Sequence, residues 1–98
     1  MKMIANIVAK IDDELEGAQG YAEDYIYEKS KGNSNTASTL KQMAAAELEH
    51  AAFQHKRAVE EIERVKQVYT APAEMEEKWK EVHKEYVDKV ARIKMMLQ

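Results

Sequence analysis

The sequence predicts an all-α protein, built from a long antiparallel helical hairpin followed by a C-terminal helix. Of its 98 residues, 34% are charged and 45% hydrophobic, whereas only three are Gly and one is Pro. This composition, poor in helix-breaking residues, is typical of a helical protein. Apolar residues recur at steps of three and four along three segments, and no segment shows the alternation that predicts a strand. We therefore expect one domain over residues 1–98, with helices over about 3–31, 35–69 and 73–97.

The first helix is expected to begin near Met3, where the apolar periodicity starts. The segment Gly32–Asn35 ends this helix and begins the next, because Gly suits the end of a helix and Ser or Asn its start. Gly17 and Gly20 lie inside the helix, and each costs it about 1 kcal/mol relative to Ala. They are either tolerated surface residues or positions of close helix approach or ligand space near Glu14. The predicted buried face consists of Ile4, Ile7, Ile11, Leu15, Ala18, Ala22 and Tyr25, with Glu14 and Tyr21 beside it.

The second helix continues for roughly 50 Å, at 1.5 Å per residue. It ends before Pro72, which cannot continue a helix but can open the next one. The third helix is amphipathic, with Glu74 near its positive start and Lys94 near its negative end. The expected inward faces are Leu40, Met43, Ala44, Glu47, Ala51, Gln54, Ala58, Ile62, Val65 and Tyr69 in the second helix, and Met75, Trp79, Val82, Tyr86, Val90, Ile93 and Leu97 in the third.

Helices of this length need a partner surface along their whole length, and a single hairpin gives each apolar face only one neighbour. Two hairpins from two chains would form a four-helix bundle with a continuous core. We therefore expect a homodimer or a higher homo-oligomer. The third helix would pack outside the bundle, cross to the partner or build a larger assembly. A monomeric three-helix bundle is the alternative.

The composition also excludes several classes of function. A net charge of −3 without a basic block argues against nucleic-acid binding. The absence of Cys excludes disulfides, zinc-thiolate sites and iron-sulfur clusters. The apolar start of the chain is too short and too interrupted for a signal or membrane segment. We therefore expect a cytoplasmic protein that does not bind membranes.

Glu47 and His50 lie three positions apart, which places a carboxylate and an imidazole on adjacent turns of the second helix. Glu47 falls near the centre of the predicted inward face, His50 lies on its flank, and the alanines around them leave space for an ion. Buried charges need a partner, so these residues are either metal ligands or a partly exposed Glu47 beside an interface His50. Carboxylates with imidazole suit Fe, Mn or Zn, and a site without Cys favours the first two. The other histidines, His55 and His83, are expected at the surface or in a helix interface.

Two segments resemble the metal-binding helices of ferritin-like di-iron proteins, particularly bacterioferritins and rubrerythrins. Glu14–Tyr21 is similar to their first such helix, in which a ligand Glu is followed seven residues later by Tyr. Glu47–Ala51 is similar to the Glu-x-x-His-Ala segment of their second helix, and the separation of 33 residues between Glu14 and Glu47 is close to that of bacterioferritins. Half-length relatives such as encapsulated ferritins likewise carry one Glu and one Glu-x-x-His per chain. The chain also resembles small ferritin-like proteins of phages and prophages.

This resemblance implies an intersubunit di-iron site, in which Glu47 bridges two iron ions and Glu14 and His50 are terminal ligands. A second chain would supply the same three residues. Tyr21 would orient a carboxylate through a hydrogen bond, or else it is an aromatic core residue with its hydroxyl at the boundary. The implied function is metal binding, with ferroxidase-type oxidation of Fe(II) by O₂ as its reaction. Many relatives have an acid where this chain has Ala46, which favours the alternative of a non-enzymatic helical interaction protein with ferritin-like packing.

Overall fold

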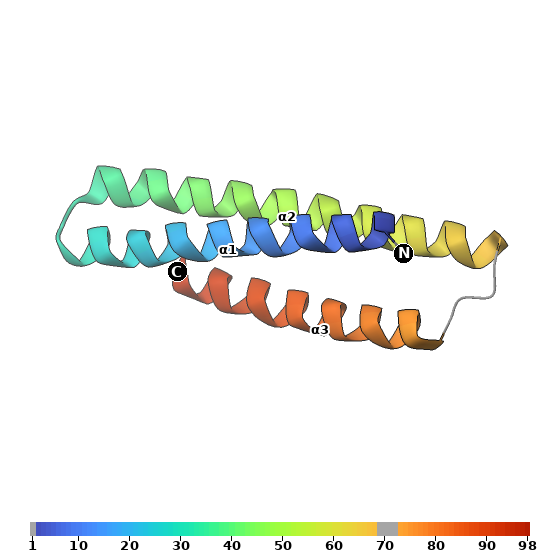
Figure 1. Ribbon diagram of the computed structural model, residues 1–98. Coiled ribbons are helices and arrows are strands. Elements are labelled where there is room, and N and C mark those ends of the chain that lie inside the picture. The colour runs from blue at the N-terminus through green and yellow to red at the C-terminus, as the bar shows by residue number, and fades with distance from the viewer. Residues whose placement is uncertain (1, 69–72) are drawn as a thin grey trace.

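The computed structural model describes residues 2–68 and 73–98, which form three α-helices and no strand (Figure 1). The helices are α1 (Lys2–Ser30), α2 (Ser34–Val68) and α3 (Ala73–Met96). α1 and α2 lie side by side and antiparallel, and α3 runs back along the hairpin from the end that holds the N-terminus toward the turn between α1 and α2 (Figure 1). The predicted all-α class and helix order are confirmed. The described helix ends differ from the predicted ones by at most one residue, and Tyr69 lies outside the described residues.

The turn between α1 and α2 depends on Gly32, whose φ is +80°. Residues with a side chain rarely adopt this left-handed conformation. The Gly32 amide donates to the Lys29 carbonyl at 3.1 Å, and the Asn33 amide donates to the Glu28 carbonyl at 3.0 Å. These bonds satisfy carbonyls that the end of α1 would otherwise leave unpaired. The Asn33 carbonyl in turn accepts a hydrogen bond from the Ala37 amide at 2.9 Å, which begins α2.

One face of α1 and one face of α2 form the main core. All seven residues predicted for the buried face of α1 are buried. On α2 the prediction is partly wrong, because Met43 remains 39% exposed while Ala37 and Leu48 are buried. Leu48 lies on the side of α2 that α3 approaches. The buried face of α2 therefore includes residues beside α3 as well as residues that face α1. The buried residues of α2 are Ala37, Ala44, Leu48, Ala51, Ala58, Ile62 and Val65.

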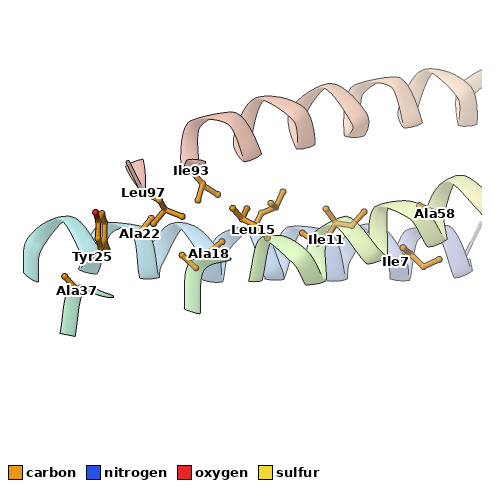
Figure 2. Close-up of a cluster of buried hydrophobic side chains, with 13 residues drawn as sticks. Ile7, Ile11, Leu15, Ala18, Ala22, Tyr25, Ala37, Ala58, Ile93 and Leu97 are labelled. Carbon is orange, nitrogen blue, oxygen red and sulfur yellow. The ribbon is translucent and has the colours of Figure 1, made fainter. Parts of the chain in front are cut away.

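α3 packs on the hairpin most closely near its C-terminus. Ile93 is 1% exposed and Leu97 is 7% exposed. Figure 2 shows Ile93 pointing toward Leu15 and Leu97 lying beside Ala22 of α1. The first half of α3 stands further off: its inward residues are only half-buried, and an open groove of about 450 Å³ separates it from the start of α1.

α3 covers only one side of the hairpin. The residues beside it include Gln19 on α1 and Ala45 on α2. At about 100° per residue, Glu14 is turned about 140° from Gln19, and His50 about 140° from Ala45. The side of the hairpin that carries Glu14 and His50 is therefore turned away from α3. We call this side the open face; its residues include Glu14, Gly17, Tyr21, Met43, Glu47 and His50.

Candidate metal site on the open face

Three residues that the sequence predicts as metal ligands lie near one another on the open face. Glu14 comes from the middle of α1, and Glu47 and His50 come from adjacent turns of α2. The Nδ1 atom of His50 lies 3.4 Å from Oε1 of Glu47. Both residues are close enough to Glu14 for their charges to act on its carboxyl group. The antiparallel hairpin thus brings together groups that are more than thirty residues apart in the sequence.

The carboxyl group of Glu14 is partly buried and lacks a full set of partners. Its Oε2 atom is buried and has no hydrogen-bond partner among the described residues. Burial raises the pKa of Glu14 above its ordinary value of 4.5; the charge of His50 opposes this rise, and the charge of Glu47 adds to it. A buried acceptor without a donor costs about 1–3 kcal/mol. A cation bound at this oxygen would remove that cost.

Glu47 occupies space that the missing side chain of Gly17 provides. A Cβ atom on residue 17 would lie 2.9 Å from Oε2 of Glu47, closer than real Cβ atoms approach other atoms. Gly20, one turn further along α1, is exposed and would place its Cβ atom with nothing within 4 Å. Of the two alternatives for these glycines, close approach therefore applies to Gly17 and a surface position to Gly20.

His50 and Tyr21 differ in how accessible they are. The side chain of His50 is 62% exposed and that of Glu47 is 28% exposed. The imidazole therefore lies at the solvent edge of the carboxylates, where it can reach a ligand on the open face. Tyr21 is half-buried and packs against the hydrophobic core. That packing agrees with the alternative in which Tyr21 is an aromatic core residue.

The residues present fit a hard or borderline divalent cation in three respects. Glu14 offers an unpartnered buried oxygen, Gly17 leaves room for the carboxylate of Glu47, and carboxylates with imidazole are ligands that iron accepts. Within residues 2–68 and 73–98, however, no three His, Asp or Glu side chains are placed to hold an ion by themselves. A di-metal carboxylate site in a helical bundle uses four Glu and two His, which is twice what one chain offers here.

A second group of titratable and aromatic side chains lies between α2 and α3. The Nε2 atom of His55 and the Nδ1 atom of His83 are 2.9 Å apart, a hydrogen-bonding distance. The ring of His55 stacks on that of Tyr86, with centroids 4.3 Å apart and planes inclined by 18°. The Trp79 ring lies 5.2 Å from the His55 ring on a tilted plane. These four side chains form what we call the imidazole cluster.

The prediction that His55 and His83 are surface or interface residues does not pair them with each other. A signal for His55 exists in the sequence. It stands seven residues after Leu48 and seven before Ile62, and both of these are buried. Residues seven apart share a helix face, so His55 belongs with them. No such signal identifies His83 as the partner, because that depends on how α3 docks.

Comparison of the chain with protein-family models, with curated proteins and with solved structures finds no match. The likeness to ferritin-like di-iron proteins therefore depends on Glu14–Tyr21 and Glu47–Ala51 and stays a prediction. In the part of the chain that the structure describes, no helix combines the length and the apolar character needed to span a bilayer.

Proposed function

We propose that this chain is a ferritin-like metal-binding protein that pairs through its open face and holds two iron ions between two copies. One observation carries the proposal: the buried Oε2 atom of Glu14 has no hydrogen-bond partner among residues 2–68 and 73–98 and lies near the carboxylate of Glu47, on a face that α3 leaves free. Two carboxylates at one site repel each other unless a proton or a cation is shared between them. A bound cation removes that repulsion and supplies the partner that Glu14 lacks.

The resemblance to ferritin-like di-iron proteins assigns each ligand a role. Glu47 would take the bridging position between two ions; it lies beside His50 and near enough to Glu14 for its charge to act there. Glu14 and His50 would be terminal ligands, and a second chain would contribute the same three groups. Iron agrees best with the resemblance, and the same ligands also accept Mn or Zn. Fe(II) held there would supply electrons for the reduction of O₂, which would make the protein a ferroxidase-type oxidoreductase.

The open face also carries apolar surface that pairing would cover. Because α1 and α2 are antiparallel and Gly17 faces Glu47, Tyr21 lies level with Met43 on this face. Met43 is 39% exposed, and Tyr21 is half-buried. Covering such side chains contributes about 25 cal/mol for each Å² of apolar surface removed from water. Two hairpins joined at this face would form a four-helix bundle, with each α3 on the outside.

Metal analysis of the purified protein tests this function. The protein is prepared without chelator, exposed to Fe(II) without oxygen, freed of unbound metal and analysed for Fe, Mn and Zn. We expect about two ions per pair of chains, as in other di-iron helical bundles. Glu47→Gln should lose most of this metal, because the amide has the same shape but no charge. Glu49→Gln, which changes a neighbouring exposed residue of α2, is the matched control and should bind as much metal as the unaltered chain.

Oxygen uptake after Fe(II) addition separates binding from oxidation. Bound iron that consumes no O₂ would support a binding role without oxidase activity. Ala46, at a position where many ferritin-like di-iron proteins have an acid, is the feature of the sequence that favours that outcome. A chain that retains no metal, or a Glu47→Gln variant that retains as much as the unaltered chain, would contradict the metal site. Either result would favour the helical interaction protein.

A further inference from the structure

The imidazole cluster lies beside the first half of α3, whose inward side chains are only half-buried. Polar contacts between α3 and the hairpin include the His55–His83 hydrogen bond, a 3.4 Å ion pair between Lys66 and Glu76, and a 3.5 Å contact from the Lys29 side chain to the last carbonyl of the chain. Of these, only the histidine pair joins the middle of α3 to α2. The apolar contacts of this half of α3 are only half-buried. The pair therefore contributes to the attachment of this part of α3.

The His55–His83 hydrogen bond tolerates only some protonation states. One of the two facing nitrogens must donate a hydrogen and the other must accept it. When neither ring or only one ring is charged, this arrangement is available. When both rings are charged, both facing nitrogens carry hydrogens and two like charges stand 2.9 Å apart. The doubly protonated pair therefore repels, and separation of α3 from α2 relieves the repulsion.

The surroundings of His55 favour its neutral form. Burial lowers the pKa of His55 below its ordinary value of 6.5, and His83 lowers it further. The faces of Tyr86 and Trp79 can attract a cation, and this attraction opposes part of the lowering. Burial and the charge of His83 are the two causes of the lowered pKa; charged groups elsewhere on the helices, such as Asp12 on α1, Lys56 and Lys66 on α2, and Glu76 and Lys80 on α3, are not among them.

We propose that the His55–His83 pair is a pH-sensitive latch, which holds the first half of α3 on the hairpin at neutral pH and releases it in mild acid. The direction follows from linkage. A group whose pKa is lowered by folding stabilises the folded form above its ordinary pKa, and that stabilisation is lost as the pH falls through the lowered value. Docking of α3 is therefore complete near pH 7.5 and weakens below about pH 6.5. Release would expose apolar surface of α1 and α3, including residues that line the groove between them.

Hydrogen exchange of the whole metal-free chain tests the latch. Exchange of the α3 amides between Trp79 and Ile93 is measured from pH 7.5 to 5.5, corrected for intrinsic rates, and compared with the middle of α1 in the same sample. Opening of α3 that takes up one extra proton rises by up to about tenfold per pH unit. We expect such a rise below pH 6.5, with no matching change in α1. Fluorescence of Trp79, the single Trp of the chain, should change over the same range.

Two variants separate the latch from general loosening of α3. His55→Asn/His83→Asn keeps polar side chains that do not titrate, so the rise in α3 exchange should disappear. Glu76→Gln removes the Lys66 ion pair instead; it should speed α3 exchange equally at all these pH values and leave the pH dependence intact. Equal α3 protection at pH 7.5 and 5.5 in the unaltered chain, or a pH dependence that survives in the double variant, would overturn the proposal.

A direct titration of the histidines provides a test that does not depend on whether α3 still docks in the double variant. In the unaltered chain, the ring resonances of His55 are followed by NMR as the pH falls. The latch predicts a midpoint below 6.5 that coincides with the opening of α3. A midpoint at or above 6.5 would overturn it.

Discussion

Gly17 of α1 faces the carboxylate of Glu47 of α2 so closely that a Cβ atom on residue 17 would lie 2.9 Å from Oε2 of Glu47. A glycine inside a long helix costs stability, because it gives the unfolded chain more freedom than Ala does. Here the missing side chain provides space for a carboxylate that belongs to the proposed metal site. The glycine that lowers the stability of α1 is thus the residue that makes room for Glu47, a proposed metal ligand.

Replacing this glycine should separate stability from metal binding. Gly17→Ala should stabilise the metal-free protein by about 0.5–1 kcal/mol, because the added methyl group meets only the movable end of Glu47. The same methyl group displaces the carboxylate, so we expect Fe(II) affinity to fall by roughly ten- to a hundredfold, as when groups that orient metal ligands are lost. Urea unfolding and anaerobic Fe(II) titration measure the two effects.

Gly20→Ala is the matched control for that variant. It lies one turn away in the same helix, and its Cβ atom would meet nothing within 4 Å. It should bring a similar gain in stability with unchanged Fe(II) affinity. Equal affinity in the two variants would mean that the space beside Gly17 has no role in metal binding.

Glu14 should destabilise the metal-free protein at neutral pH. Burial raises the pKa of Glu14, so the folded protein holds the proton of this carboxyl group more tightly than the unfolded chain does. The stability gained in this way is fully present below pH 4.5 and is lost as the pH rises through the raised value. Glu14→Gln should therefore raise the melting temperature at pH 7 by about 2–4 °C, and this gain should disappear near pH 4. Thermal unfolding followed by circular dichroism, with chelator present, makes the measurement.

The exposed neighbour Glu16 provides the control, and Glu16→Gln should leave the melting temperature nearly unchanged. With Fe(II) present, the order should reverse, because only the unaltered chain gains stability from the metal. A Glu14→Gln variant that is less stable than the unaltered chain at pH 7 without metal would show that the carboxyl group has a favourable partner.

Ile93 should anchor the C-terminal half of α3. Its side chain is 1% exposed and points toward Leu15 of α1 (Figure 2). Ile93→Ala should lower the free energy of unfolding by about 2–4 kcal/mol, the usual cost of removing a buried aliphatic side chain. Met95→Ala, at a position that is 70% exposed, should change it by less than about 0.5 kcal/mol. Similar losses in both variants would contradict the packing of α3 described above.

The periodicity of the sequence predicts α1 better than α2. α1 presents one apolar face to the core, and the steps from Ile4 to Tyr25 identify it completely. α2 has α1 on one side and α3 on another, so its buried face is wider and displaced toward Leu48. The sequence pattern is centred instead between the core and the open face, which is why Met43 is predicted inward and is found exposed.

The same distinction applies to the candidate site. The nearness of Glu14, Glu47 and His50 could be predicted because two antiparallel helices joined by a short turn fix which residues lie level, whereas their role as metal ligands stays a prediction. The pairing of His55 with His83 could not be predicted, because it depends on the docking of α3, which no local pattern specifies. The paired four-helix bundle remains a prediction from helix length and from the resemblance.

Molar mass measured by sedimentation tests the central claim most directly, because an intersubunit site couples metal binding to association. The chain and its Glu47→Gln variant are compared over a range of concentrations, without oxygen, with Fe(II) or with chelator. We expect Fe(II) to shift the unaltered chain toward a species of two chains at concentrations where the chelated protein dissociates, and to leave the variant unaffected. A chain that stays monomeric at every concentration, with and without Fe(II), would contradict the account.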